Sequence, residues 1–335
     1  MWLVRDDVPM AEPWDMSKYA IDPELLPWLD MLPTIALTDA ESLAEKRASL
    51  DEMGSVLPPY DATNAIDVRD ELVPGPDGAP EVPVRVYRRA GQEGAQPGLF
   101  YIHGGGFVIG GLEMADRFAM PVVDELGIVV VAVDYRLAPE TPFPGPVEDC
   151  YAALVWTANK ASELGIDPAR LAVGGESAGG GLSAATALLA RDRGGPALSY
   201  QYLWIPELDD RLETESMRAY VDTPLWNYPN AVFSWDSYLG EGKRGTADVS
   251  PYAAPARATD LSGLPPTVVT VCQFDPLRDE GLEYARRLSQ ANVPTELRGY
   301  AGTFHGSSLV GDAAVTQRAA ADQLEDLRRG LEVAS

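Results

Sequence analysis

One serine in the sequence stands in a pattern that suits nucleophilic chemistry. Ser177 lies in the pentapeptide GESAG, which matches Gly-x-Ser-x-Gly, between the apolar run RLAVGG and a helical segment rich in alanine and leucine. In a tight strand-to-helix turn the hydroxyl is exposed, and the flanking glycines let neighbouring backbone approach without side-chain clashes. The pattern therefore predicts a nucleophile at Ser177, with an ordinary glycine-rich turn as the alternative.

A serine hydroxyl needs a base to take its proton, and the base is usually a histidine held by a carboxylate. The sequence contains only His103 and His305. His103 precedes the serine in a glycine-rich loop, whereas His305 follows the predicted last strand TELRGY. Where this kind of turn carries the nucleophile, the chain order is serine, acid and then histidine. His305 is therefore the predicted base.

The predicted acid is Asp275. It stands just beyond the apolar run TVVTVC in the stretch PPTVVTVCQFDPLRDEG, in the loop position expected of the carboxylate that orients the histidine. Asp279 and Glu280 follow it, and we expect these two residues to cap the next helix.

Three consecutive glycines, Gly104 to Gly106, follow His103 in the stretch IHGGGF. Attack on an ester carbonyl places negative charge on the carbonyl oxygen, and backbone N–H groups must point at that oxygen. Glycines leave such amides uncovered, and the N–H of Ala178, after the nucleophile, is a further donor. The stretch therefore predicts an oxyanion hole; a flexible turn is the alternative.

Other ligand-binding patterns are incomplete in the sequence. No Gly-Lys-Ser/Thr follows the glycine-rich loops, and residue 109 is not the glycine that a dinucleotide fingerprint requires. With two histidines, two cysteines and no His-Glu-x-x-His, a metal site has little support. We therefore expect no metal and no cofactor.

The elements that must position these residues follow an α/β pattern. Two alternating stretches, AIDVRDELVP and VPVRVYRR, flank the turn PGPDG and predict a hairpin from residue 65 onwards. Short continuous apolar runs then alternate with helical segments such as 147–164 and 280–292, which predicts a mostly parallel central sheet flanked by helices. These runs are GLFYI, GIVVVAV, RLAVGG, YQYLWI and TVVTVC.

Two segments fall outside this alternation. Residues 1–60 are rich in proline and aromatic residues and contain one predicted helix, with Thr38 as N-cap and Gly54 at its end. We expect this stretch to be a cap segment and residues 61–335 to be the catalytic domain. Residues 207–250 are too long for a connecting loop and are expected to form a second, helical cap segment inserted over the sheet edge.

Composition restricts the classes of partner. The chain of 335 residues contains 26 basic and 51 acidic residues, so its net charge is −25. This charge disfavours binding to nucleic acid, anionic membranes and polyanionic substrates. The N-terminus lacks the pattern of a signal peptide, no stretch approaches the ~18 apolar residues of a membrane span, and Cys150 and Cys272 form no disulfide framework. We expect a soluble, cytoplasmic protein, and the sequence allows a homodimer.

These motifs resemble the bacterial hormone-sensitive-lipase-like family of α/β-hydrolase carboxylesterases over about residues 65–330. The resemblance is carried by HGGGFV, DYRLAPE, PFPGPVEDC, GGESAGGGL, DPLRDEG and His305, in the family's order and spacing. It implies an α/β-hydrolase fold with a helical cap, and it implies that His103 and DYRLAPE hold the loops in place. The catalytic triad that the resemblance implies is Ser177, Asp275 and His305. The oxyanion hole that it implies is formed by Gly104, Gly105 and Ala178.

The activity expected on this basis is hydrolysis of small, uncharged esters with short acyl chains through an acyl-enzyme. An amidase, lactonase or thioesterase with the same triad is an alternative, and a ligand-binding receptor without catalysis is another. Glu176 and Ser307 depart from the residues common at these family positions, so substrate preference does not transfer. The predicted cap contains four tryptophans that either line the substrate pocket or pack the cap onto the domain: Trp14, Trp28, Trp226 and Trp235.

Overall fold

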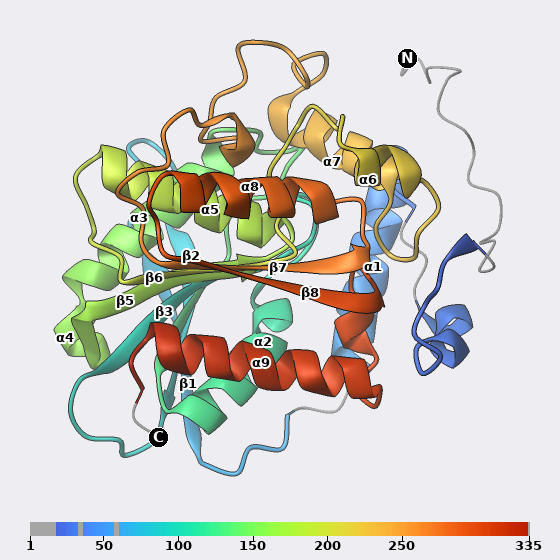
Figure 1. The fold of residues 1–335 in the computed structure, drawn as a ribbon. Helices are drawn as coiled ribbons and strands as arrows, with labels where there is room; N and C mark the ends of the chain where they lie inside the picture. Colours follow the sequence, from blue (N-terminus) through green and yellow to red (C-terminus); the bar gives the residue numbers. More distant parts are fainter. Residues whose placement is uncertain (1–17, 33–35, 57–59, 334–335) are drawn as a thin grey trace.

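An eight-stranded sheet forms the centre of the protein (Figure 1). The computed structural model describes residues 18–32, 36–56 and 60–333. The strand order in the sheet is β1-β2-β4-β3-β5-β6-β7-β8. The strands are β1 (Ile66–Val73), β2 (Val82–Arg89), β3 (Gln96–Ile102), β4 (Val129–Val133), β5 (Ile166–Glu176), β6 (Tyr200–Trp204), β7 (Thr267–Phe274) and β8 (Thr295–Phe304).

The predicted hairpin and the mostly parallel sheet are both confirmed. Strands β1 and β2 pair antiparallel along their whole length, and β2 also pairs antiparallel with β4. Every further pair, from β4–β3 to β7–β8, is parallel. The carboxyl ends of β3, β5, β6, β7 and β8 therefore meet at one edge of the sheet. All five residues of β4 are buried, as expected of a strand covered on both faces.

Helices cover both faces of the sheet. Figure 1 shows α3, α5 and α8 on one face and α2 and α9 on the other. The predicted helix 147–164 is divided at Lys160 into two helices, and the predicted helix 280–292 begins and ends two residues earlier. The bounds are α2 (Leu112–Leu126), α3 (Gly145–Asn159), α4 (Ala161–Leu164), α5 (Ala178–Asp192), α8 (Arg278–Gln290) and α9 (Ala314–Gly330).

The helix predicted in the N-terminal segment is present as α1 (Ala40–Val56), but its capping residue differs from the prediction. The Ser42 amide donates to Asp39 Oδ1 at 2.9 Å, so Asp39 is the N-cap instead of Thr38. An aspartate next to the first helical residue satisfies one of the unpaired amides of the first turn. Gly54 lies within the helix and does not end it.

The segment 207–250 contains two helices, α6 (Glu215–Ala219) and α7 (Tyr228–Leu239). The side chains of Thr214 and Asn227 cap them by accepting hydrogen bonds from backbone amides of the first turn. In Figure 1, α1, α6 and α7 gather at the edge where β7 and β8 end. The Leu37 amide donates to Asn230 Oδ1 on α7 at 3.0 Å, so the two segments are joined there.

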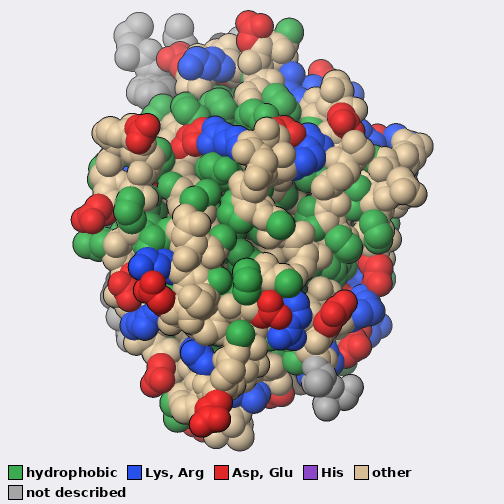
Figure 2. Space-filling model, turned by 90° about the vertical axis from the view of Figure 1, so that its left-hand side faces the viewer, with side chains coloured by type: hydrophobic (Ala, Val, Ile, Leu, Met, Phe, Trp, Pro, Cys, Tyr) green, Lys and Arg blue, Asp and Glu red, His purple; other side chains and the backbone are tan. Residues whose placement is uncertain are grey.

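Charged side chains lie on the surface of the protein (Figure 2), and both cysteines lie in its interior. On the face in Figure 2, acidic and basic side chains are interspersed and apolar side chains are more frequent towards the middle. Cys150 and Cys272 are both buried and unpaired. No helix in the described part of the chain is both long and apolar enough to span a membrane.

Candidate active site

Ser177 occupies the sharp turn between β5 and α5. Its φ of 55° and ψ of −123° are unusual for a residue with a side chain, so the surrounding structure must hold it there. A Cβ atom on Gly175 or Gly179 would lie 2.3 or 2.1 Å from the Ile102 carbonyl oxygen at the end of β3. The flanking glycines are therefore required because the end of β3 closely approaches the turn from β5 into α5, which is the strand-to-helix turn that the sequence predicts.

The structure brings Ser177, His305 and Asp275 together in one line of hydrogen bonds. Ser177 Oγ lies 2.9 Å from His305 Nε2, and His305 Nδ1 lies 2.8 Å from Asp275 Oδ2. The other Asp275 oxygen accepts the Leu277 amide at 2.9 Å, which fixes the carboxylate. All three side chains follow carboxyl ends of parallel strands and are buried. With Asp275 bound to Nδ1, the free His305 Nε2 faces the serine hydroxyl.

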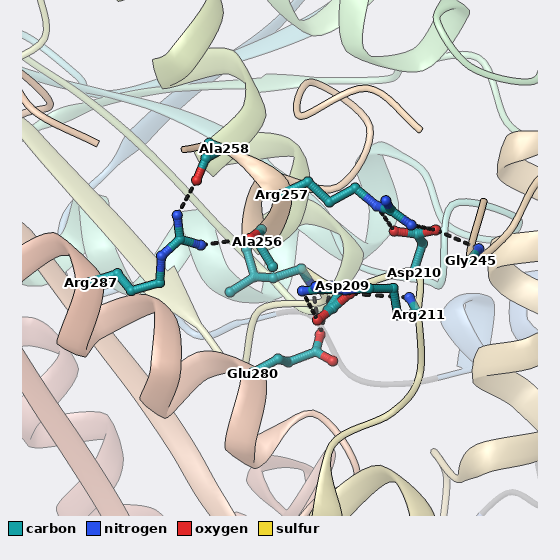
Figure 3. Close-up of polar contacts among 10 residues, drawn as sticks. Asp209, Asp210, Arg211, Gly245, Ala256, Arg257, Ala258, Glu280 and Arg287 are labelled. Carbon is teal, nitrogen blue, oxygen red and sulfur yellow. Dashed lines mark hydrogen bonds and ion pairs between the residues drawn. The ribbon is translucent and has the colours of Figure 1, made fainter. Parts of the chain in front are cut away.

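Asp279 and Glu280 do not cap α8 as predicted. The helix already begins at Arg278, and both side chains point to other segments. Asp279 Oδ2 accepts the Ser216 amide of α6 at 2.7 Å. Glu280, labelled in Figure 3, accepts the Leu208 amide with its Oε1 at 2.6 Å. Buried backbone N–H groups of the insertion need acceptors, and these carboxylates supply them.

The glycine-rich loop lies directly beside the serine. A Cβ atom on Gly104 would be 3.4 Å from Ser177 Cβ, and one on Gly105, whose φ is +115°, would be 2.0 Å from the Ile109 carbonyl oxygen. Within the described residues, the backbone N–H groups of Gly104, Gly105 and Ala178 donate no hydrogen bond. Three uncommitted donors are therefore present around the nucleophile candidate.

Two hydrogen bonds orient the loop amides. The Tyr135 hydroxyl donates to the His103 carbonyl at 3.0 Å, and His103 Nδ1 lies 2.7 Å from the Gly104 carbonyl. In a trans peptide group the N–H points opposite to the C=O, so these bonds set the directions of the Gly104 and Gly105 N–H groups. Burial lowers the pKa of His103 to about 4, so its ring is neutral and Nδ1–H is the donor.

Trp226 covers the site from the insertion. Its ring centroid lies 5.8 Å from that of His305, and a Cβ atom on Gly106 would approach the indole to 2.3 Å. The indole N–H is buried and has no partner among the described residues. Trp235 packs instead on Phe107, with ring centroids 5.3 Å apart.

The structure does not place Trp28 or Trp14 beside the serine. The Trp28 side chain is 37% exposed, which places it at the surface. Trp14 lies outside the described residues.

Behind the serine lies Glu207, a fully buried carboxyl group that no sequence motif indicates. Its amide donates to the Ser177 carbonyl at 3.0 Å, and its Oε1 lies 3.0 Å from Ser234 Oγ on α7. Burial, with a smaller contribution from the negative Asp275, raises the pKa of Glu207 to about 8. In the sequence, the only sign that Glu207 lies near the site is its position two residues after the predicted strand YQYLWI. Burial also raises the pKa of Glu176, beside the serine.

Comparison with known proteins identifies the family. Residues 99–309 match the family described as alpha/beta hydrolase fold, and this match spans more than half of the chain. The chain therefore belongs to the α/β-hydrolase family, and the resemblance to hormone-sensitive-lipase-like esterases is confirmed. The eight-stranded, mostly parallel sheet agrees with that assignment.

Several of the similar proteins are named as esterases. The chain is 38% identical over 299 residues to carboxylesterase NlhH of Mycobacterium tuberculosis, covering 89% of this chain and 91% of the relative. A solved structure of a bacterial heroin esterase is 53% identical with a TM-score of 0.88, covering 94% of this chain and 98% of the other. Esterase LipW from Mycobacterium marinum is 34% identical with a TM-score of 0.84, covering 96% and 98%. The predicted enzyme class, a carboxylic ester hydrolase, agrees with these relatives.

Proposed function

We propose that this protein is a serine carboxylesterase that hydrolyses small, uncharged esters with short acyl chains through an acyl-enzyme. The continuous hydrogen bonds from Ser177 through His305 to Asp275 carry the proposal. Ser177 attacks the ester carbonyl while His305 takes its proton and then gives it to the leaving alcohol. Asp275 holds the imidazole in the required tautomer and stabilises its charged form. Water then releases the acid by the same steps.

The oxyanion that forms during attack requires donors near Ser177. The uncommitted N–H groups of Gly104, Gly105 and Ala178 support their assignment as the oxyanion hole. The positive φ of Gly105 and the hydrogen bonds to the carbonyls of His103 and Gly104 keep these amides fixed before the substrate arrives. Fixed donors need no reorganisation during the reaction, which is why each contributes roughly 10²–10³ in rate.

The substrate class follows from the surroundings of the site. The indole of Trp226 is an apolar surface against His305, and the protein carries a net charge of −25, which repels anionic substrates. We propose that residues 1–60 and 207–250 form a cap over the site, and their contact through Leu37 and Asn230 supports it. The cytoplasmic location and the homodimer remain predictions.

The decisive experiment compares substrates. The full-length enzyme is assayed with p-nitrophenyl esters of increasing acyl length, beside matched amides, lactones and thioesters. We expect the highest kcat/KM for acetate or butyrate esters and no effect of EDTA. Ser177→Ala should lose nearly all turnover while remaining folded by circular dichroism. Preference for an amide, lactone or thioester would replace the esterase assignment, and binding without turnover would indicate the receptor alternative.

A further inference from the structure

A single buried hydroxyl, that of Ser234 on α7, lies between two oxygen atoms. Ser234 Oγ is 2.9 Å from the Gly106 carbonyl oxygen and 3.0 Å from Glu207 Oε1. A hydroxyl has one proton to donate, and both a carbonyl and a carboxylate can only accept. If Glu207 were ionised, one of these two short oxygen–oxygen contacts would therefore have no proton between its atoms.

A protonated Glu207 removes this conflict. Its Oε1–H donates to Ser234 Oγ, and the Ser234 hydroxyl then donates to the Gly106 carbonyl. We propose that Glu207 works as a neutral carboxylic acid and is a positioning residue, which ties cap helix α7 to the glycine-rich loop 103–109 through Ser234. This inference rests on the proposed function, because the loop is the proposed oxyanion hole.

The surroundings of Glu207 favour the neutral form. The side chain is fully buried, its second oxygen has no hydrogen-bond partner, and no described lysine or arginine pairs with it. The titratable groups that face it are the carboxyl groups of Asp275 and Glu280 and the phenol of Tyr135, none of which is a cation. An isolated buried carboxylate is costly, in agreement with the raised pKa of about 8.

The segment that carries Glu207 is held rigidly, so its side chain cannot easily turn away. Glu280 on α8 accepts the Leu208 amide at 2.6 Å, and Arg257 donates to Asp210 Oδ2 at 2.8 Å (Figure 3). The Gly245 amide binds the same Asp210 oxygen. With these anchors just after Glu207 and with its own amide bound to the Ser177 carbonyl, Glu207 remains opposite Ser234.

Ionisation of Glu207 is expected to loosen the loop. The carbonyls of Gly104 and Gly105 find their hydrogen-bond partners inside the loop itself. His103 Nδ1 lies next to the Gly104 carbonyl, and the amides of residues 108 and 109 donate to the Gly105 carbonyl. The Gly106 carbonyl has its partner on the cap, at Ser234. A Glu207 carboxylate would attract the Ser234 proton more strongly than a carbonyl does, and Gly106 would lose its hydrogen bond. Activity should therefore decline as Glu207 loses its proton.

The test measures kcat for phenyl acetate from about pH 6.5 to about pH 10, with spontaneous hydrolysis subtracted. We expect wild-type kcat to fall roughly tenfold, with a midpoint near pH 8, less than the 10²–10³ lost when an oxyanion donor is removed. Glu207→Gln should retain most activity at neutral pH and lack the fall, because its amide N–H₂ donates to Ser234 at every pH. Ser234→Ala should lower kcat at neutral pH and also lack the fall.

Glu280→Gln is the matched control, because it replaces a second buried carboxyl group near Glu207 and should keep the alkaline fall. Infrared difference spectra of wild type minus Glu207→Gln should show a protonated carboxyl band near neutral pH that disappears at about pH 10. The same fall in Glu207→Gln as in wild type, or no such band, would overturn the inference. If Glu207→Gln does not fold, Ser234→Ala decides through its pH profile. Ester turnover retained by Ser177→Ala would refute the proposed function separately.

Discussion

At the scale of single residues, the site depends on which carboxylate holds His305. Three acidic side chains lie close together in the chain, but only Asp275 contacts the imidazole, at 2.8 Å. Asp279 holds the Ser216 amide of α6, and Glu280 holds the Leu208 amide. The three carboxylates thus have three different partners, although their sequence neighbourhood is nearly the same.

Asp275→Asn should lower kcat by roughly 10⁴, because an asparagine keeps the shape but favours the wrong imidazole tautomer. Asp279→Asn is the matched control: it should leave kcat near that of wild type and cost about 1 kcal/mol of stability through a weaker hydrogen bond to Ser216. Both are checked by steady-state kinetics and thermal unfolding. A collapse of kcat in a folded Asp279→Asn variant would show that the acid of the triad is assigned wrongly.

Glu207 also gives a prediction for stability. Its pKa is about 8 in the folded protein against an ordinary value of 4.5. Between these pH values the unfolded chain binds fewer protons at Glu207 than the folded chain, so its contribution to stability is greatest below pH 4.5 and decreases as pH rises to 8. The Tm of Glu207→Gln relative to wild type should therefore rise from pH 5 to pH 8. A difference that is constant over this window would contradict the raised pKa.

At the scale of elements, the N-terminal segment is attached to the catalytic loops by α1. Arg47 Nε donates to the Val108 carbonyl at 2.8 Å, and its terminal nitrogens bind the Ala138 carbonyl and Glu140. Val108 lies shortly after the glycine run 104–106, which contains Gly104 and Gly105 of the proposed oxyanion hole. One side chain therefore connects the proposed cap to the loop that the chemistry requires.

Arg47→Ala should change the preference for acyl length, because the cap loses its fixed position over the site. We expect the ratio of kcat/KM for butyrate and acetate esters to shift several-fold, with little effect on the Tm. Arg69→Ala is the control, since Arg69 forms an exposed ion pair with Glu71 on the edge strand β1. Equal selectivity in Arg47→Ala and wild type would argue against residues 1–60 as a cap.

At the scale of the whole molecule, the net charge of −25 is the dominant property. Like charges repel one another across the surface, and this repulsion destabilises the compact state. Salt shortens the range of such interactions from about 30 Å at 0.01 M to about 10 Å at 0.1 M.

Thermal unfolding in increasing NaCl at neutral pH should therefore show a rising Tm. The increase in Tm with salt should be smaller near pH 5, because protonation of carboxylates makes the net charge less negative. A Tm that falls with salt at neutral pH would mean that attractive ion pairs, such as that between Arg298 and Asp326, outweigh the repulsion.

The sequence by itself determined the order of the strands along the chain and the turn at Ser177, and it predicted that His305 and Asp275 accompany this serine. These features are local, because hydrophobic period, glycine placement and position after a strand are visible in short windows. The tertiary structure alone decided that Asp279 and Glu280 bind the segment 207–250 and that Glu207 lies behind the serine. Those roles depend on contacts between residues far apart in the sequence, such as Glu280 with Leu208, where burial selects which polar group finds a partner.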